Sequence, residues 1–111
     1  MNPDHEIELI LVSVPDAETG KRLARQLAEE RLIACANILP GMTSIYTWQG
    51  SVEEAEETLL ILKTRPSLFE RVESFLKREH PYDTPEIVGI RTADVSGQYR
   101  EWLLDSTLGH F

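Results

Sequence analysis

Apolar residues in this 111-residue chain change their spacing from one segment to the next, and this alternation constrains the fold more than any other feature. Residues 7–14 are β-branched and apolar, and Pro15 stops the run, which is typical of a buried strand. Asp16 can then serve as an N-cap, and apolar residues recur at helical spacing as far as about Arg31. The chain is therefore predicted to begin with a strand and an amphipathic helix.

A second apolar region spans residues 32–47 and is interrupted by Pro40-Gly41, which would bend or bulge a strand and exclude a helix. A glycine-containing turn follows, and residues 58–64 are again typical of a strand. We expect this strand to pair with residues 42–47 as a hairpin. Residues 52–57 are ambiguous, because their glutamates favour a helix by intrinsic propensity.

Pro66 suits the first turn of a second amphipathic helix, which should end by Pro81. Residues 87–90 then predict a short strand. A closing helix is predicted from four residues that would share one face: Val95, Tyr99, Trp102 and Leu103.

The predicted order is strand, helix, hairpin, helix, strand, helix. This is the α+β, ferredoxin-like βαββαβ arrangement with an additional C-terminal helix, in one domain over residues 1–111. Residues 1–6 are expected to be a flexible N-terminus. The two main helices would cover only one face of the sheet, so the other face gives a physical reason to expect self-association.

Charge and cysteine content limit the partners and the compartment. Eleven lysines and arginines stand against nineteen aspartates and glutamates, and the net charge of −8 disfavours nucleic acid and anionic membranes as partners. Cys35 is the single cysteine, so no disulfide forms within the chain and a reducing compartment is expected. No signal peptide or membrane span is predicted, and we expect a soluble, cytoplasmic protein.

No catalytic motif is recognisable, and the chain is not expected to be an enzyme. Cys35 lies in an apolar run, where it is either a small buried hydrophobe or a residue with a metal or redox role. His80 is either a helix C-cap or part of a polar pocket wall stiffened by the prolines around it. Trp48 is either a core anchor under the hairpin turn or a ligand platform, and is partly buried in both interpretations.

Four stretches stand in a specific order and spacing along the chain: LIACAN at 32–37, PGMTSIYTWQG at 40–50, LKT at 62–64 and HPYDTPE at 80–86. Together they resemble the CutA family of divalent-cation tolerance proteins. The resemblance runs from about Ile7 to Trp102, nearly the whole chain.

The resemblance implies a homotrimer in which neighbouring sheets join edge to edge, and a cytoplasmic protein linked to copper and other divalent metals. Cys35 and His80 match candidate metal contacts of the family, and no cofactor is required. Some bacterial relatives carry a further cysteine and a second histidine where this chain has Val12 and Glu79. The chain thus lacks two of the ligand types that select copper over harder cations.

The resemblance also predicts a cleft between subunits that binds a divalent cation or a small ligand. Cys35 and His80 would be its metal donors, and the remaining expected lining residues are Asn37, Trp48, Lys63, Tyr82 and Glu86. Of these, Asn37 and Lys63 would contact an anion or carbonyl, and Trp48 and Tyr82 would form an aromatic wall. The alternative is a trimeric scaffold or signalling protein similar to the PII-type sensors, which binds a small effector or a protein partner.

Overall fold

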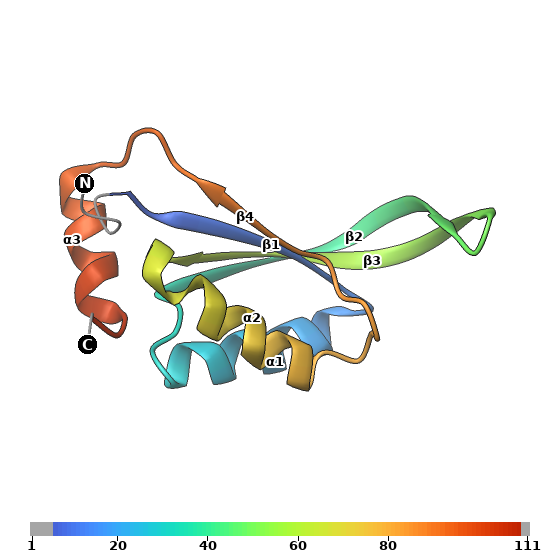
Figure 1. The fold of residues 1–111 in the computed structure, drawn as a ribbon, viewed down its shortest axis with the longest axis horizontal. Helices are drawn as coiled ribbons and strands as arrows, with labels where there is room; N and C mark the ends of the chain where they lie inside the picture. The colour runs from blue at the N-terminus through green and yellow to red at the C-terminus, as the bar shows by residue number, and fades with distance from the viewer. Residues whose placement is uncertain (1–5, 110–111) are drawn as a thin grey trace.

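The computed structural model describes residues 6–109 (Figure 1). The predicted flexible N-terminus lies outside these residues except for its last position. The elements, in chain order, are β1 (Glu8–Val14), α1 (Ala17–Glu29), β2 (Cys35–Trp48), β3 (Ser51–Thr64), the 3₁₀ turn η2 (Pro66–Leu68), α2 (Phe69–Glu79), β4 (Ile87–Arg91) and α3 (Gly97–Ser106).

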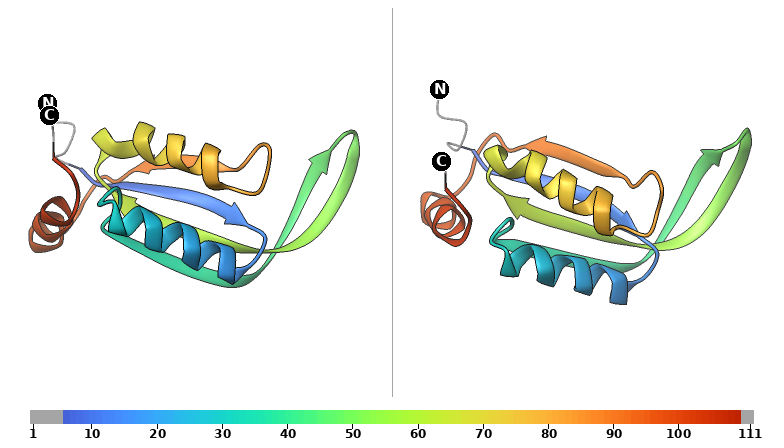
Figure 2. Two further views of the ribbon diagram at one scale, coloured as in Figure 1. Left: turned by 90° about the horizontal axis from the view of Figure 1, so that it is seen from below. Right: turned by 60° about the horizontal axis from the view of Figure 1, so that its bottom comes forward.

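The four strands form one sheet in the order β2-β3-β1-β4, and every neighbouring pair is antiparallel. Helices α1 and α2 lie side by side on one face of this sheet (Figure 2). Helix α3 lies at one end of the sheet, and the β2–β3 hairpin projects from the opposite end (Figures 1 and 2). The predicted α+β, ferredoxin-like arrangement with an additional C-terminal helix is confirmed.

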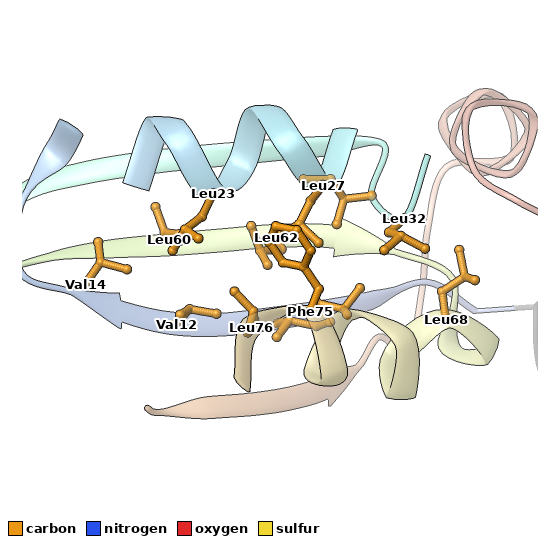
Figure 3. Packing of buried hydrophobic residues seen from close by; sticks show 13 residues of the cluster. Val12, Val14, Leu23, Leu27, Leu32, Leu60, Leu62, Leu68, Phe75 and Leu76 are labelled. Carbon is orange, nitrogen blue, oxygen red and sulfur yellow. The ribbon is translucent and has the colours of Figure 1, made fainter. Parts of the chain in front are cut away.

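The hydrophobic core lies between the sheet and its two covering helices (Figure 3). Alternate residues of β1 and β3 point into it, among them Val12 and Leu62, and both are fully buried. Leu27 from α1 and Leu76 from α2 meet them there. Asp16 is the N-cap of α1 as predicted, and its side chain accepts a hydrogen bond from the Thr19 N–H at 2.8 Å.

The hairpin is confirmed, but its predicted register is wrong. Residues 58–64 pair with β1 and with the first part of β2, whereas residues 42–48 pair with 51–57. The acidic segment 52–57 is therefore strand, because cross-strand pairing outweighs its helical propensity. Thr43 Oγ1, for example, donates a hydrogen bond to Glu56 Oε1 across the ladder at 2.7 Å.

A bulge in β2 separates these two halves of the hairpin. The register shifts between Leu39 and Met42, where Pro40 has no N–H to donate and Gly41 has a φ of 79°. Beyond the bulge, β2 and β3 continue as a two-stranded arm, defined here as residues 42–57, which β1 no longer flanks. The arm extends well past the helices (Figure 1).

Trp48 lies on this arm beside its turn. Its side chain is 53% exposed, so the interpretation as a core anchor under the turn is wrong. A core anchor needs a hairpin that lies on the body of the protein, whereas no second layer from residues 6–109 covers the arm (Figure 2).

Two arginines hold α3 against the end of the sheet. Arg31 Nη2 donates to the Asp105 carbonyl at 2.8 Å, and Arg65 Nε donates to Thr107 Oγ1 at 2.9 Å. Cations beside the C-terminus of a helix are favourable, because its last carbonyls lack partners within the helix. The predicted closing helix begins only at Gly97, so Val95 precedes it, while Leu103 is its fully buried residue.

Candidate functional site

His80 follows directly after α2 and caps it through its backbone N–H, which donates to the Leu76 carbonyl at 2.8 Å. The side chain is only 7% exposed. Its Nε2 lies 2.8 Å from the Ser13 carbonyl oxygen, and its Nδ1 accepts the backbone N–H of Tyr82 at 3.0 Å. A carbonyl requires a donor and an N–H requires an acceptor, so this geometry assigns the neutral ring with its proton on Nε2.

Both ring nitrogens of His80 are thus already bonded to backbone groups. Burial lowers the pKa of His80 below its usual value, although the hydrogen bond to Ser13 acts in the opposite direction. His80 is therefore a C-cap through its backbone N–H, and its ring orders the following loop without itself forming a pocket wall. In this arrangement neither nitrogen has a lone pair free for a metal ion.

Tyr82 connects that loop to the arm. Its hydroxyl donates to Glu57 Oε2 at 2.7 Å, and its ring packs against His80 with a centroid distance of 4.8 Å. Burial and the neighbouring Glu57 raise the pKa of Tyr82, so the phenol stays protonated and remains a donor. Glu86, at the far end of the loop, accepts a hydrogen bond from Ser13 Oγ at 3.3 Å.

A cleft of about 760 Å³ opens between the arm and the loop 81–86. The arm contributes Tyr46, Trp48 and Glu57, and the loop contributes Tyr82 and Glu86. Three of the predicted cleft residues, Trp48, Tyr82 and Glu86, are therefore brought together, with His80 directly behind them.

Sequence reasoning missed several lining residues, including Ser13, Ser44, Tyr46 and Glu57. Ser44 and Tyr46 could have been found, because they alternate with Trp48 and so share one face of a strand. Ser13 and Glu57 reach the cleft because of the way the strands pair. No local sequence pattern predicted that pairing.

The other predicted residues lie at the opposite end of the sheet. Cys35 pairs with Lys63 across the β2–β3 ladder, and Asn37 pairs with Ile61. Lys63 Nζ lies 6.0 Å from the centre of the Tyr99 ring, and burial together with the nearby Cys35 raises the pKa of Tyr99. Cys35 is partly buried, not fully enclosed as a core residue would be.

Cys35 and His80 do not meet within one chain. Lys63, the partner of Cys35, also pairs with Leu9 of β1, whereas His80 contacts Ser13 four residues further along that strand. Four residues of strand span roughly 13 Å. Across residues 6–109, moreover, no cluster of three or more histidine, cysteine, aspartate or glutamate side chains is arranged to hold a metal ion.

Comparison with known proteins assigns the family. The family model described as CutA1 divalent ion tolerance protein matches residues 8–106. The chain belongs to the CutA family.

The similarity extends over nearly the full length of a bacterial relative. The divalent-cation tolerance protein CutA of Thermus thermophilus is 45% identical over 100 residues, which cover 90% of this chain and 97% of that protein. The chloroplastic protein CutA of Arabidopsis thaliana is 43% identical over 89% of this chain, which spans only 54% of that relative. The crystal structure of CutA1 from Oryza sativa superposes with a TM-score of 0.91 at 41% identity, covering 95% of this chain and 96% of that one.

The structure also bears on the expected absence of a membrane span. None of the helices within residues 6–109 is long and apolar enough to cross a membrane.

Proposed function

We propose that this protein is a non-catalytic divalent-cation tolerance protein, a cytoplasmic homotrimer that binds copper or another divalent cation between its subunits without requiring a cofactor. The observation that carries this proposal is the 45% identity to a protein named for divalent-cation tolerance, over 97% of that protein's length. This chain's own residues support both the assembly and the binding of a cation.

The uncovered face of the sheet supports self-association. Residues that alternate with the core positions of β1 and β4 face away from α1 and α2, and apart from Ser13 at the end of β1 they are apolar. Val88 pairs with Leu11 and is 47% exposed, and Ile90 pairs with Leu9 and is 43% exposed. An apolar sheet face without a covering layer is stabilised when further copies of the chain bury it.

The two edges of the sheet support the same conclusion. β2 and β4 are its outermost strands, and each presents backbone groups that no strand within residues 6–109 pairs. Such edges pair readily with another strand. Joining the β2 edge of one subunit to the β4 edge of the next would satisfy both and, repeated three times, would close a ring.

Cation binding in this proposal uses Cys35 and His80 from different subunits, since they lie apart in one chain. Thiolate and imidazole are ligands that suit copper and zinc. His80 would first have to release either the Ser13 carbonyl or the Tyr82 N–H. Metal binding at His80 should therefore loosen the loop 81–86.

Isothermal titration of the metal-stripped, reduced protein with Cu(I), Cu(II) and Zn²⁺ tests this proposal. We expect saturable binding that is lost in Cys35→Ala or His80→Ala while light scattering still gives the mass of three chains. Cys35→Ser, which keeps the shape of the side chain but removes the soft donor, should fail like Cys35→Ala. A light-scattering mass of one chain at micromolar concentration would overturn the proposal, as would binding no tighter than millimolar.

The cytoplasmic location rests on the single cysteine, which fits a reducing compartment. Relatives differ in this respect: the Arabidopsis protein is named chloroplastic, and a solved structure from Archaeoglobus fulgidus is named periplasmic. Fractionation of the native host, with the protein recovered among cytoplasmic markers, is the result we expect. Recovery with periplasmic or organelle markers would correct the location without affecting the assembly.

One observation favours a second candidate function, the binding of a small effector by a PII-like trimer. The cleft beside the arm has about 760 Å³, which falls in the range of sites for small molecules and far exceeds the space that one metal ion needs. Hydrogen exchange of the arm is the test, because a bound effector should protect amides of residues 42–57. Exchange unchanged by any ligand or partner would count against this candidate.

A further inference from the structure

We infer that the cleft between the arm and the loop 81–86 binds a small organic cation, a compound with an ammonium or guanidinium group. This inference rests on the second candidate function, the binding of a small effector. It concerns the end of the sheet that holds Trp48 and Tyr82, not the end that holds Cys35.

The charged groups that line the cleft are all negative. The charged side chains that line the cleft are Glu57, Asp83 and Glu86, and among residues 6–109 no lysine or arginine lines it. Arg22 exerts an electrostatic influence on His80, behind the wall, but does not line the cleft itself. A recess lined by charges of one sign between walls of low dielectric concentrates counter-ions, so cations are favoured in this cleft.

The walls of the cleft are aromatic. Tyr46 and Trp48 project from the arm, and Tyr82 faces them from the loop. In the single chain all three remain partly exposed, although large aromatic surfaces are usually buried. Faces of tyrosine and tryptophan attract ammonium and guanidinium groups, and this attraction strengthens where water is excluded. Aromatic faces together with carboxylates are the combination that recognises organic cations.

The same cleft is poorly suited to a bare metal ion. Hard cations such as Ca²⁺ take six to eight oxygen ligands at short range, and no cluster of three metal-ligating side chains exists within residues 6–109. Soft cations require sulfur or imidazole, yet no cysteine or histidine of the described residues 6–109 lines the cleft, and both nitrogens of His80 are bonded to backbone groups. The volume of about 760 Å³ fits an organic molecule.

The hydrogen bond from Tyr82 to Glu57 gives the cleft a defined width. It joins the loop to the arm at 2.7 Å, and it orients one Glu57 oxygen while the carboxylate retains further acceptor sites for a ligand. Ser13 orients Glu86 in the same way from β1. These two carboxylates are therefore held in place before a ligand arrives, which reduces the entropy lost on binding.

Tryptophan fluorescence reports directly on this cleft. The chain has two tryptophans, and Trp102→Phe leaves Trp48 as the single reporter. In that background the trimer is titrated with butylammonium and butylguanidinium at about 0.15 M ionic strength, with butanol and butyrate as the neutral and anionic controls. We expect a saturable change with the two cations and none with butanol or butyrate.

Matched variants separate a specific site from a general effect of charge. Glu57→Gln removes a charge inside the cleft, whereas Glu54→Gln removes one from the same strand where alternation places it on the opposite face. We expect Glu57→Gln to weaken the affinity at least tenfold, about 1.4 kcal/mol, and Glu54→Gln to leave it unchanged. Tyr82→Phe should also weaken it, because Glu57 loses its orienting donor.

Three outcomes would overturn the inference: no saturable change at millimolar cation, an equal response to butanol or butyrate, or equal losses in Glu54→Gln and Glu57→Gln. Its failure remains distinguishable from failure of the proposed function. A trimer that binds copper but no organic cation refutes only this inference, and a monomer that binds organic cations refutes the homotrimer.

Discussion

His80 Nε2 lies 2.8 Å from the carbonyl oxygen of Ser13, and this contact ties the end of α2 to the end of β1. The other ring nitrogen accepts the Tyr82 N–H, so one buried side chain fixes both the sheet and the loop that forms a wall of the cleft. The position that family resemblance marks as a metal contact is, in this chain, a structural connection between three elements.

Replacing His80 should therefore destabilise the fold. His80→Ala leaves the Ser13 carbonyl and the Tyr82 N–H without their partners, and an unpaired buried polar group costs about 1–3 kcal/mol. His80→Gln, which retains a donor and an acceptor, should lose less. Urea unfolding at a fixed protein concentration measures both variants, and a His80→Ala protein as stable as the parent would contradict the connecting role.

The same residue predicts a pH dependence. The pKa of His80 is lowered in the folded state, so the unfolded chain binds more protons over the range between the two values. Stability should therefore fall as the pH drops below about 6.5 and should level off below the folded-state pKa. His80→Gln should flatten the dependence in this range, and an unchanged slope in that variant would assign the effect to other groups.

The uncovered sheet face predicts how assembly can be broken. Val88→Glu places a charge on that face and should shift the mass seen by light scattering from three chains towards one. Val52→Glu makes the same change near the tip of the arm, where Val52 is 75% exposed, and should leave the mass unchanged. Equal masses for Val88→Glu and the parent would place the subunit contact elsewhere.

The turn at the tip of the arm requires positive φ at both of its central residues. Gln49 and Gly50 both have positive φ, 48° and 81°, as a two-residue hairpin turn of type I′ requires. Gly50→Ala should cost about 1–2 kcal/mol locally and speed the amide exchange of the arm. Gly97→Ala is the control, because Gly97 lies at the start of α3 with nothing within 4 Å of an added Cβ. Unchanged exchange in Gly50→Ala would contradict the turn assignment.

Local periodicity was enough to predict most of the fold. β1 and the two covering helices follow from apolar spacing and from the Asp16 cap, because each buries one face against the same core. The register of the hairpin could not be predicted. Its acidic segment 52–57 favours a helix in isolation, and the bulge at Pro40 lets both strands run for 14 residues.

The candidate site was predictable only in part. The motif at 80–86 and Trp48 come together because the loop and the arm meet at one end of the sheet. Cys35 and Lys63 pair with each other at the other end of the sheet. Their distance from the cleft follows from the length and pairing of the strands, which the motifs do not reveal. Ser13 enters the site through its contacts with His80 and Glu86, which join segments far apart in the sequence.

Native mass spectrometry of the reduced, metal-stripped protein, before and after addition of Cu(II), tests the central claim most directly, because one spectrum reports assembly and metal content together. We predict a species with the mass of three chains that gains bound copper on addition and keeps its subunit number. A single-chain mass, or a trimer that takes up neither Cu(II) nor, in a parallel addition, Zn²⁺, would contradict the proposed function.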